Sequence, residues 1–238
     1  MILQSLVEQY GRLLDEPDVE IAVPGYSRVG VVATLVLDKT GHLVDVHSSM
    51  QKQGKKLVPT PMMVPEQAKR TSGVDANLLC DNSGYVLGCT RDKQGILSLT
   101  PDKFQAFREA NLEMTESLSC ASITAFRSFL ESWEPELAHT HPVLLKQADI
   151  VFEPGQLSFR LDGAMNMLHE EPILRTKWDE GQAIVSDKWV AQCLVTGMDL
   201  PIAKLHPSIK RVRGAQSSGA SLVSFNKDSF VSYGKEQS

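Results

Sequence analysis

The sequence predicts an α+β fold with mixed, mostly antiparallel sheets and hairpins and a helical segment in the middle of the chain. Runs rich in Val, Leu and Thr lie on both sides of that segment and are bounded by turn-forming residues, as is typical of strands. In between, apolar residues recur at helical spacing. We therefore expect residues 1–98 to be β-rich after an N-terminal helix, residues 99–148 to be helical, and residues 149–238 to be β-rich and to end in a Gly/Ser-rich basic loop.

The first part of the chain is expected to begin with a helix and to continue into a β-hairpin. Apolar residues recur at helical spacing over residues 3–14, before Pro17. Residues 28–38 are rich in Val, Leu and Thr, and a turn at residues 39–41 joins them to a second apolar run at residues 43–46. This pattern predicts two antiparallel strands.

The next segments combine strand-forming residues with residues that turn or break the chain. Residues 51–56 are expected to form a basic polar loop around a glycine. Two prolines interrupt residues 57–64, which can therefore form only an edge strand or an extended segment. Residues 81–84 favour tight turns, and residues 85–87 are then expected to form a short strand.

Two helices are predicted in the middle of the chain, over residues 101–116 and 120–133. Phenylalanine and leucine residues recur there at helical spacing, and Thr100, followed by proline and aspartate, is a favourable N-terminal cap. Acidic residues outnumber basic ones over residues 102–153. This face of the protein is expected to avoid phosphate groups.

The last part of the chain returns to strand-forming patterns. Residues 150–152 and 157–161 flank a Glu-Pro-Gly turn and are expected to form a second hairpin. A short helix is expected near residues 172–180. Strands therefore lie on both sides of the helical segment, which places the chain in the α+β class.

Composition describes an ordinary globular protein whose contacts with nucleic acid would have to be local. The 238 residues carry a formal net charge of −5 and the isoelectric point is about 5.7. No apolar run approaches the roughly 18 residues that a membrane span needs, and the N-terminus has no signal-peptide pattern. Four scattered cysteines suit a reducing compartment. We therefore expect a cytoplasmic protein with no membrane partner.

Patterns for metal sites and for catalysis are weak, so neither a cofactor nor an enzymatic activity is expected. No C-x-x-C pair accompanies the histidines, and Cys193 is expected to be a buried structural cysteine. The serines lack a G-x-S-x-G motif, and residues 214–219 lack the lysine that ends a nucleotide-binding phosphate loop. The dispersed aspartates give no argument for a two-metal nuclease.

The most informative stretch is residues 205–237, where a basic cluster precedes a loop of small residues. Lys204, Lys210, Arg211 and Arg213 fall within ten residues that contain no Asp or Glu. The glycines and serines that follow would let a phosphate backbone approach closely and would donate hydrogen bonds to it. A solvated basic turn followed by a flexible loop explains the composition equally well, so both interpretations stay open.

A second polar cluster lies near the end of the first β-rich part. Its basic, hydroxyl and carboxamide side chains belong to Lys69, Arg70, Thr71, Ser72, Asn77 and Asn82. These residue types can contact a ligand. A pair of structural turns is a slightly better explanation when the residues are taken alone.

Three longer segments carry a resemblance that covers nearly the whole chain: LVLDKTGHLVDV, MMVPEQAKRTSGVDANLLCDNSGYVLG and CLVTGMDLPIAKLHPSIKRVRGAQSSGASLVSFNKDSFVSYGKEQ. They resemble the CRISPR-associated large subunit of the type I-C Cascade, the Csd family of the Dvulg subtype. The last segment is much more specific than any short motif. Proteins of this family are considerably longer, so the resemblance implies that residues 1–238 are an amino-terminal domain whose carboxyl-terminal helical domain is absent.

The resemblance implies a non-catalytic subunit of an RNA-guided CRISPR surveillance complex in antiviral defence. In such a complex the crRNA reads the target by base pairing, while the large subunit recognises the protospacer-adjacent motif in double-stranded DNA. The subunit would also promote target unwinding and help to recruit a helicase-nuclease. The implied partners are double-stranded target DNA, crRNA, the other type I-C Cascade subunits and that helicase-nuclease. A phage-encoded inhibitor is a further possible partner, which no residue pattern indicates.

The resemblance also assigns both polar clusters to DNA binding. The implied DNA-binding residues are Lys69, Arg70, Thr71, Ser72, Asn77, Asn82, Lys210, Arg211, Arg213, Gln216, Ser217, Ser218 and Asn226. The basic residues would neutralise phosphates, the amides and hydroxyls would approach base edges, and Gly214 and Gly219 would permit the loop conformation. The alternative is an interaction module that docks the crRNA 5′ handle and neighbouring subunits without reading DNA.

Overall fold

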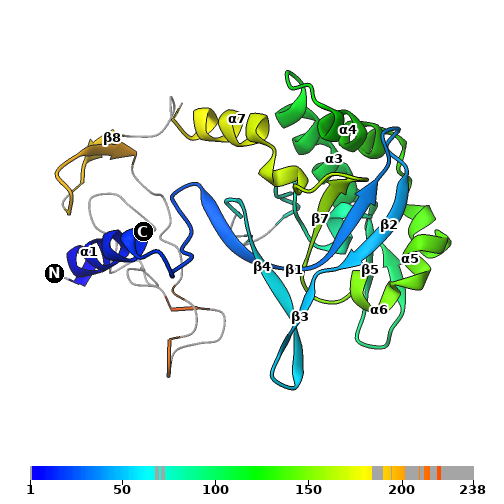
Figure 1. Ribbon diagram of the computed structural model, residues 1–238, viewed down its shortest axis with the longest axis horizontal. Helices are drawn as coiled ribbons and strands as arrows, with labels where there is room; N and C mark the ends of the chain where they lie inside the picture. The colour runs from blue at the N-terminus through cyan, green and yellow to red at the C-terminus, as the bar shows by residue number, and fades with distance from the viewer. Residues whose placement is uncertain are drawn as a thin grey trace. The chain divides into compact units, whose positions relative to one another are not determined.

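The structure is a computed structural model (Figure 1) that describes residues 2–67, 70, 73–183, 190–193, 195–201, 209, 212–214 and 219–220. The chain divides into two compact units. The first unit contains Met1–Arg12 and Ile184–Ser238, and the second contains Leu13–Ala183. Helices and mostly antiparallel strands confirm the predicted α+β class.

A five-stranded sheet organises the second unit. Its strands follow the order β2 (Leu43–Ser48), β1 (Tyr26–Leu37), β4 (Lys56–Pro65) and β3 (Met50–Gln53), each antiparallel to its neighbour, and β7 (Gln156–Leu161) pairs in parallel with β1. The second half of β1 is buried without interruption. A strand that is covered on both faces has such a continuous apolar sequence.

The predicted hairpin of residues 28–46 is confirmed as β1 and β2. In the turn between them, the Asp38 carboxylate accepts hydrogen bonds from the backbone N–H groups of Thr40 and His42, both at 2.9 Å. Gly41 has a φ of +91°, which side-chain-bearing residues rarely adopt. Neighbouring residues alone therefore determine this turn, which explains why the sequence predicts it.

The second predicted hairpin, of residues 150–152 and 157–161, is wrong. The first segment lies at the end of helix α6 (Ala148–Val151), and the second lies in β7. β7 pairs in parallel with β1, with Phe159 opposite Leu35. Parallel strands need a long connection, so local sequence patterns do not reveal this pairing.

The structure corrects two expectations for residues 51–65. Residues 51–53 lie in β3 and residue 56 begins β4, so the basic polar segment is mostly strand. β4 is not an edge strand, because it lies between β1 and β3 in the sheet order. Its residues 56–59 pair with β3 and its residues 60–65 pair with β1. Each half of β4 therefore keeps one edge largely unpaired, and the unpaired edge of the first half accommodates Pro59.

The predicted helices are confirmed as α1 (Ile2–Asp15), α3 (Pro101–Thr115), α4 (Ala121–Ser132) and α7 (Pro172–Ala183). Thr100 occupies the N-cap position of α3, but its hydroxyl donates a hydrogen bond to the carbonyl of Gly84 at 2.8 Å instead of capping the helix. Proline at the first helical position starts α3, because its fixed φ suits a helix.

The short strand predicted at residues 85–87 is wrong, because these residues begin within helix α2 (Ser83–Val86) and end just after it. Asn82 is the N-cap of α2, and its side chain accepts a hydrogen bond from the backbone N–H of Gly84 at 3.1 Å. Tyr85, Val86 and Leu87 are buried. The cap selects a helical turn, and burial of the apolar side chains stabilises it.

Shorter elements complete the described part of the chain. They are β5 (Cys89–Arg91), β6 (Leu97–Leu99), η1 (Pro135–His139), α5 (Pro142–Lys146) and η2 (Leu168–Glu170) in the second unit, and β8 (Val190–Gln192) and β9 (Asp199–Pro201) in the first. β5 pairs with β6, and β8 pairs with β9. Among the described residues, no helix is both long and apolar enough to cross a membrane.

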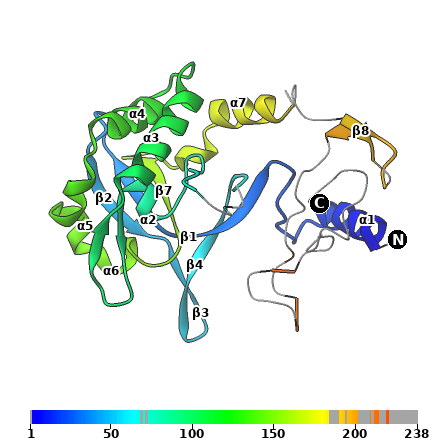
Figure 2. The same cartoon turned by 180° about the vertical axis from the view of Figure 1, so that it is seen from behind.

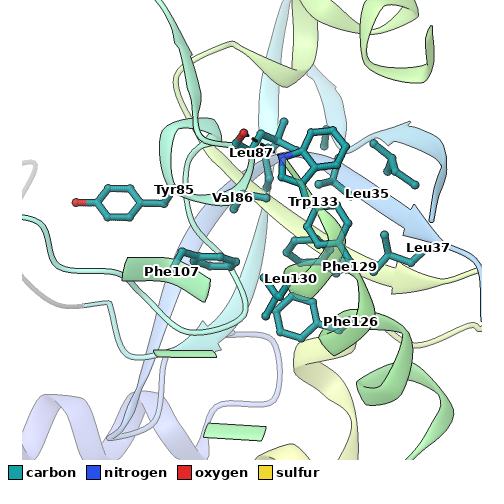
Figure 3. Packing of buried hydrophobic residues seen from close by; sticks show 14 of the residues in the cluster. Leu35, Leu37, Tyr85, Val86, Leu87, Phe107, Phe126, Phe129, Leu130 and Trp133 are labelled. Carbon is teal, nitrogen blue, oxygen red and sulfur yellow. Dashed lines mark hydrogen bonds between the residues drawn. The ribbon is translucent and has the colours of Figure 1, made fainter. Parts of the chain in front are cut away.

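Four phenylalanine rings join two helices to the sheet in the core of the second unit. The ring centroid of Phe159 in β7 lies 4.8 Å from that of Phe126, 5.4 Å from that of Phe129 and 6.4 Å from that of Phe107. The rings of Phe107, Phe126 and Phe129 belong to α3 and α4, and Figure 3 shows them in one cluster of buried residues with Leu35 of β1. Aromatic pairs add about 0.5–1.5 kcal/mol each to the burial of apolar area, so this cluster fixes both helices on the sheet.

His169 is a buried titratable group beside β7. It is 3% exposed, and its Nδ1 lies 3.2 Å from the hydroxyl oxygen of Ser158. Burial lowers the pKa of His169 to about 4, from 6.5 in an unfolded chain, because the charged imidazolium is costly to desolvate. The stability that the neutral ring contributes is therefore fully present above pH 6.5 and is lost as the pH falls toward 4.

Replacing His169 by glutamine is expected to flatten the pH dependence of stability in this window. In the unaltered chain, the free energy of unfolding should fall by about 3 kcal/mol between pH 6.5 and 4, since one pKa unit corresponds to about 1.4 kcal/mol. Urea unfolding at several pH values measures the difference. A His42→Gln variant removes an exposed histidine and should keep the original dependence. An unchanged profile in His169→Gln would show that another group is responsible.

Replacing Gly41 by alanine is expected to destabilise the second unit by about 2–4 kcal/mol, from backbone strain and overpacking together. An added Cβ would lie 2.6 Å from Ser128 Cβ and 2.7 Å from the carbonyl oxygen of Ala125, both in α4. Gly95 has a similar φ of +86° and no atom within 4 Å of an added Cβ, so Gly95→Ala is the matched control. Urea unfolding should give a markedly smaller loss for Gly95→Ala, and equal losses would contradict the packing argument.

Candidate nucleic-acid interface

The basic loop, defined as residues 210–219, is closed at its base by a β-bridge between Ile209 and Ala220. Each of these two residues donates its backbone N–H to the carbonyl of the other at 2.8 Å. The ten residues of the loop include three basic residues and no acidic residue. A hydrogen-bonded pair of this kind holds its Cα atoms about 5.5 Å apart, so the bridge brings the two ends of this basic segment together.

The described residues within the basic loop show why glycine occurs there. Gly214 has a φ of +86° and Gly219 has a φ of +117°, values that favour glycine at both positions. Arg213, directly before the first glycine, is exposed. The loop therefore presents at least one guanidinium group to solvent beside a sharp change in backbone direction.

Nine of the predicted DNA-binding residues lie outside the described part of the chain, and their roles stay predictions: Lys69, Thr71, Ser72, Lys210, Arg211, Gln216, Ser217, Ser218 and Asn226. The structure describes the other four. Arg213 belongs to the first unit. Arg70, Asn77 and Asn82 belong to the second unit, where all three interact with one buried carboxylate.

Arg70 is held in a bidentate ion pair with that carboxylate, Asp81. Its Nη1 donates a hydrogen bond to Asp81 Oδ1 at 3.1 Å, and its Nη2 donates to Oδ2. Its Nε donates to the carbonyl of Asp75 at 2.5 Å, and its guanidinium carbon lies 4.0 Å from the ring centroid of Tyr85. The side chain of Asp81 is fully buried and that of Arg70 is 24% exposed. The charge of Arg70 is therefore balanced inside the protein.

Asp81 also organises the backbone on both sides of itself. Its carboxylate accepts hydrogen bonds from the backbone N–H of Asn77 at 2.9 Å and from that of Asn82 at 2.8 Å. Its own backbone carbonyl accepts a hydrogen bond from Leu157 of β7 at 2.7 Å, which ties the segment to the sheet. Asn77 and Asn82 thus take part in turns around Asp81, as the alternative interpretation of the sequence proposes.

Asn111 is a site residue that the sequence interpretation missed. From the buried face of α3, its Oδ1 accepts a hydrogen bond from the backbone N–H of Leu79 at 2.7 Å, and its Nδ2 donates to the carbonyls of Phe107 at 2.8 Å and Asn77 at 3.3 Å. Among the described residues, Leu79 alone combines a side chain with a positive φ, of +61°. This conformation costs about 1–2 kcal/mol and is held by the Asn111 bond. The sequence signal that could have identified Asn111 is an asparagine at an apolar position of a predicted helix, because a buried polar side chain needs hydrogen-bond partners.

Tyr85 is a second missed residue, because the sequence places it in a strand. Tyr85 is 3% exposed, and two cations approach its ring: the guanidinium carbon of Arg70 lies 4.0 Å from the ring centroid, and Lys103 Nζ lies 5.7 Å from it. Contacts of this kind contribute about 0.5–2 kcal/mol each. The Arg70 cluster, defined as Arg70, Asp81, Tyr85 and Asn111, is therefore a rigid support for residues 75–82.

Two of the four cysteines, Cys80 and Cys193, differ in chemistry. Cys80 is fully buried, and burial, with a smaller effect of the Asp81 carboxylate, raises the pKa of its thiol, which stays protonated and unreactive. Cys193 in the first unit is partly exposed, which corrects the expectation of a buried cysteine. A hydrogen bond with the side chain of Thr196 lowers the pKa of Cys193. Within the described residues, no three His, Cys, Asp or Glu side chains form a group that could hold a metal ion.

Comparison with known families agrees with the resemblance in the sequence. Residues 6–238 match the family described as CRISPR-associated protein (Cas_Csd1), and the chain belongs to this family. No curated protein sequence matches the chain. Membership implies a CRISPR-associated subunit of a Cascade complex, with crRNA and other Cascade subunits as partners.

Replacing Asp81 by asparagine is expected to lower the free energy of unfolding by about 3 kcal/mol, because removal of one partner of a buried ion pair leaves the other uncompensated. Urea unfolding of the purified chain measures this loss. The matched control is Glu20→Gln, which breaks the exposed pair between Glu20 and Arg28. That change should cost less than about 1 kcal/mol. Equal small losses in both variants would show that the Arg70 cluster does not stabilise the fold.

Proposed function

We propose that the chain belongs to the type I-C Cascade subunit that recognises the protospacer-adjacent motif in double-stranded DNA, promotes target unwinding and helps to recruit the helicase-nuclease. One observation carries the proposal: a member of a CRISPR-associated family, with a net charge of −5, has three basic and no acidic residues in the segment that the Ile209–Ala220 bridge closes. In RNA-guided complexes base pairing reads the long target, and the protein reads a short duplex motif. The proposed subunit is non-catalytic.

Different residues of the basic loop, together with Asn226 further along the chain, would contact phosphates and bases. Lys210, Arg211 and Arg213 neutralise backbone phosphates and position the duplex, which carries no sequence information by itself. Amide and hydroxyl groups of the following residues, Gln216, Ser217, Ser218 and Asn226, approach the base edges. The exposed position of Arg213 and the positive φ of the two loop glycines support this assignment.

The Arg70 cluster would contribute to DNA recognition mainly by keeping the site rigid, and less by its positive charge. Its guanidinium is paired with Asp81, so a phosphate would have to compete with a bidentate contact. Lys69, Thr71 and Ser72 flank Arg70 in the sequence and are the groups proposed to reach DNA. The cluster then holds the neighbouring backbone in place.

A second function is favoured by a different observation. Asn77 and Asn82 already make hydrogen bonds within the turns around Asp81, which leaves fewer groups to read bases in the second unit. The segment could then dock the crRNA 5′ handle and neighbouring Cascade subunits, with DNA read elsewhere. RNA and DNA phosphates present the same charge to a basic loop.

Binding of the purified chain to three short ligands separates these functions. The ligands are a duplex with the motif, the same duplex without it, and the handle RNA, each titrated at two salt concentrations. Tighter binding to the motif duplex that persists at higher salt supports motif recognition. Equal binding to all three that disappears with salt would overturn it and support docking. Cleavage in the presence of divalent metal would overturn the non-catalytic assignment.

Replacing Lys210, Arg211 and Arg213 by alanine is expected to weaken binding equally to targets with correct and altered motifs. Three lost phosphate contacts lower the slope of log K against log salt by about 2.7. Gln216→Ala should instead weaken only the correct target and leave the slope unchanged. Fluorescence anisotropy over a salt series measures both effects. A triple variant whose loss is confined to the correct motif would mean that these cations read bases.

A further inference from the structure

The hairpin formed by β3 and β4 carries exposed positive charge that the function proposed above does not use. Residues 51–57 are all exposed and include Lys52, Lys55 and Lys56 but no acidic residue. Within the described residues, none of these three ammonium groups has an ion-pair partner. Figures 1 and 2 show the hairpin extending beyond the other strands of the sheet. Its charge is therefore available to a ligand.

A tight turn fixes which side chains share a face of this hairpin. Gln53 pairs with Lys56, so the loop between them has only two residues. Gly54 is the first of the two and has a φ of +63°, the position where a type II′ turn needs glycine. Such turns match the natural twist of two strands and hold their register. The hairpin is thus a defined ribbon with a fixed order of side chains.

The two faces of the ribbon differ. Directly paired residues lie on the same face, and side chains alternate along each strand. The register therefore places Gln51, Gln53 and Lys56 on one face, and Lys52 and Leu57 on the other. One face thus combines two carboxamides with a cation. Carboxamide and lysine side chains are the groups that bind base edges and phosphates.

The end of the ribbon lies well away from the Arg70 cluster. β4 has ten residues, which corresponds to about 33 Å of extended chain. The basic tip adjoins the start of β4, whereas Arg70 follows its other end. The ribbon is therefore a separate contact within the second unit.

We propose that this hairpin enters the major groove of duplex DNA, with Lys52, Lys55 and Lys56 on phosphates and the amides of Gln51 and Gln53 facing base edges. The inference rests on the proposed function and adds an element to it. The major groove of B-DNA is about 12 Å wide and 8.5 Å deep and admits a two-stranded ribbon. The four paired residues of each strand extend about 13 Å, which is enough to reach the groove floor.

Other ligands fit the ribbon less well. The major groove of an RNA duplex is too narrow and deep for side chains to read. A protein partner would require a larger apolar area, and Leu57, at 62% exposed, is the one large exposed apolar residue between residues 50 and 58 of the described hairpin. Duplex DNA is therefore the ligand that fits the shape of the ribbon, the hydrogen-bonding groups of its amides and its positive charge together.

The test is a triple variant, Lys52→Ala with Lys55→Ala and Lys56→Ala, in the 238-residue chain. Its binding to a B-form duplex should lose about 2.7 from the slope of log K against log salt. The charge-matched control replaces Lys39, Lys93 and Lys146, which are exposed on other elements, and should retain the slope. Because all six side chains are exposed, urea unfolding should show unchanged stability.

A second variant tests the amides. Gln51→Ala with Gln53→Ala should reduce discrimination between duplexes of different sequence at constant salt slope. A triple lysine variant that keeps the full slope, or an unaltered chain that binds RNA duplexes through the hairpin as tightly as DNA, would overturn the inference. An unaltered chain that binds no duplex would overturn the proposed function as well. The two failures are therefore distinguishable.

Discussion

The backbone of β1 holds the second unit together, because it pairs with three other strands. Its first half pairs with β4, and its second half pairs with β2 and β7. The ring of Phe159 on β7 then meets the phenylalanines of α3 and α4. A shift of one residue in the pairing register would move every side chain of a paired strand to the opposite face of the sheet. The Arg70 cluster, which is attached to β7 and α3, and the basic hairpin, which extends from β4, both depend on it.

Positive charge serves two different purposes in this chain. Arg70 is paired with a buried carboxylate and stacked on an aromatic ring, so it fixes the backbone around it. The lysines of the hairpin and the exposed arginine of the basic loop are solvated and can exchange water and counterions for phosphate. A buried pair confers geometry, while exposed cations confer affinity that depends on salt. Residue type alone does not show which purpose a basic residue serves, because this depends on how far its side chain is buried and on the groups that it contacts.

Local patterns in the sequence predict the parts of the fold that neighbouring residues determine. Helical spacing reveals α3 and α4, and Val-rich runs around an Asp-Lys-Thr-Gly turn reveal β1 and β2. The parallel pairing of β7 joins distant segments, and the cap at Asn82 overrides the strand preference of Tyr85 and Val86, so both are missed. At the candidate site, the sequence indicates a polar cluster near Arg70. It does not reveal that Asp81 and Asn111 hold the cluster, because these contacts form only when the chain is folded.

A proline of β4 affects how copies of the protein meet. Each half of β4 leaves one edge largely unpaired, and such edges are templates for a strand from another molecule. Pro59 supplies no N–H at the unpaired edge of the first half, and the lysines at the end of the hairpin repel the same lysines of a second copy. A strand from a second molecule could therefore not form a complete row of backbone hydrogen bonds at this edge, and it would meet a positively charged surface. The hairpin can therefore extend from the sheet without promoting edge-to-edge aggregation.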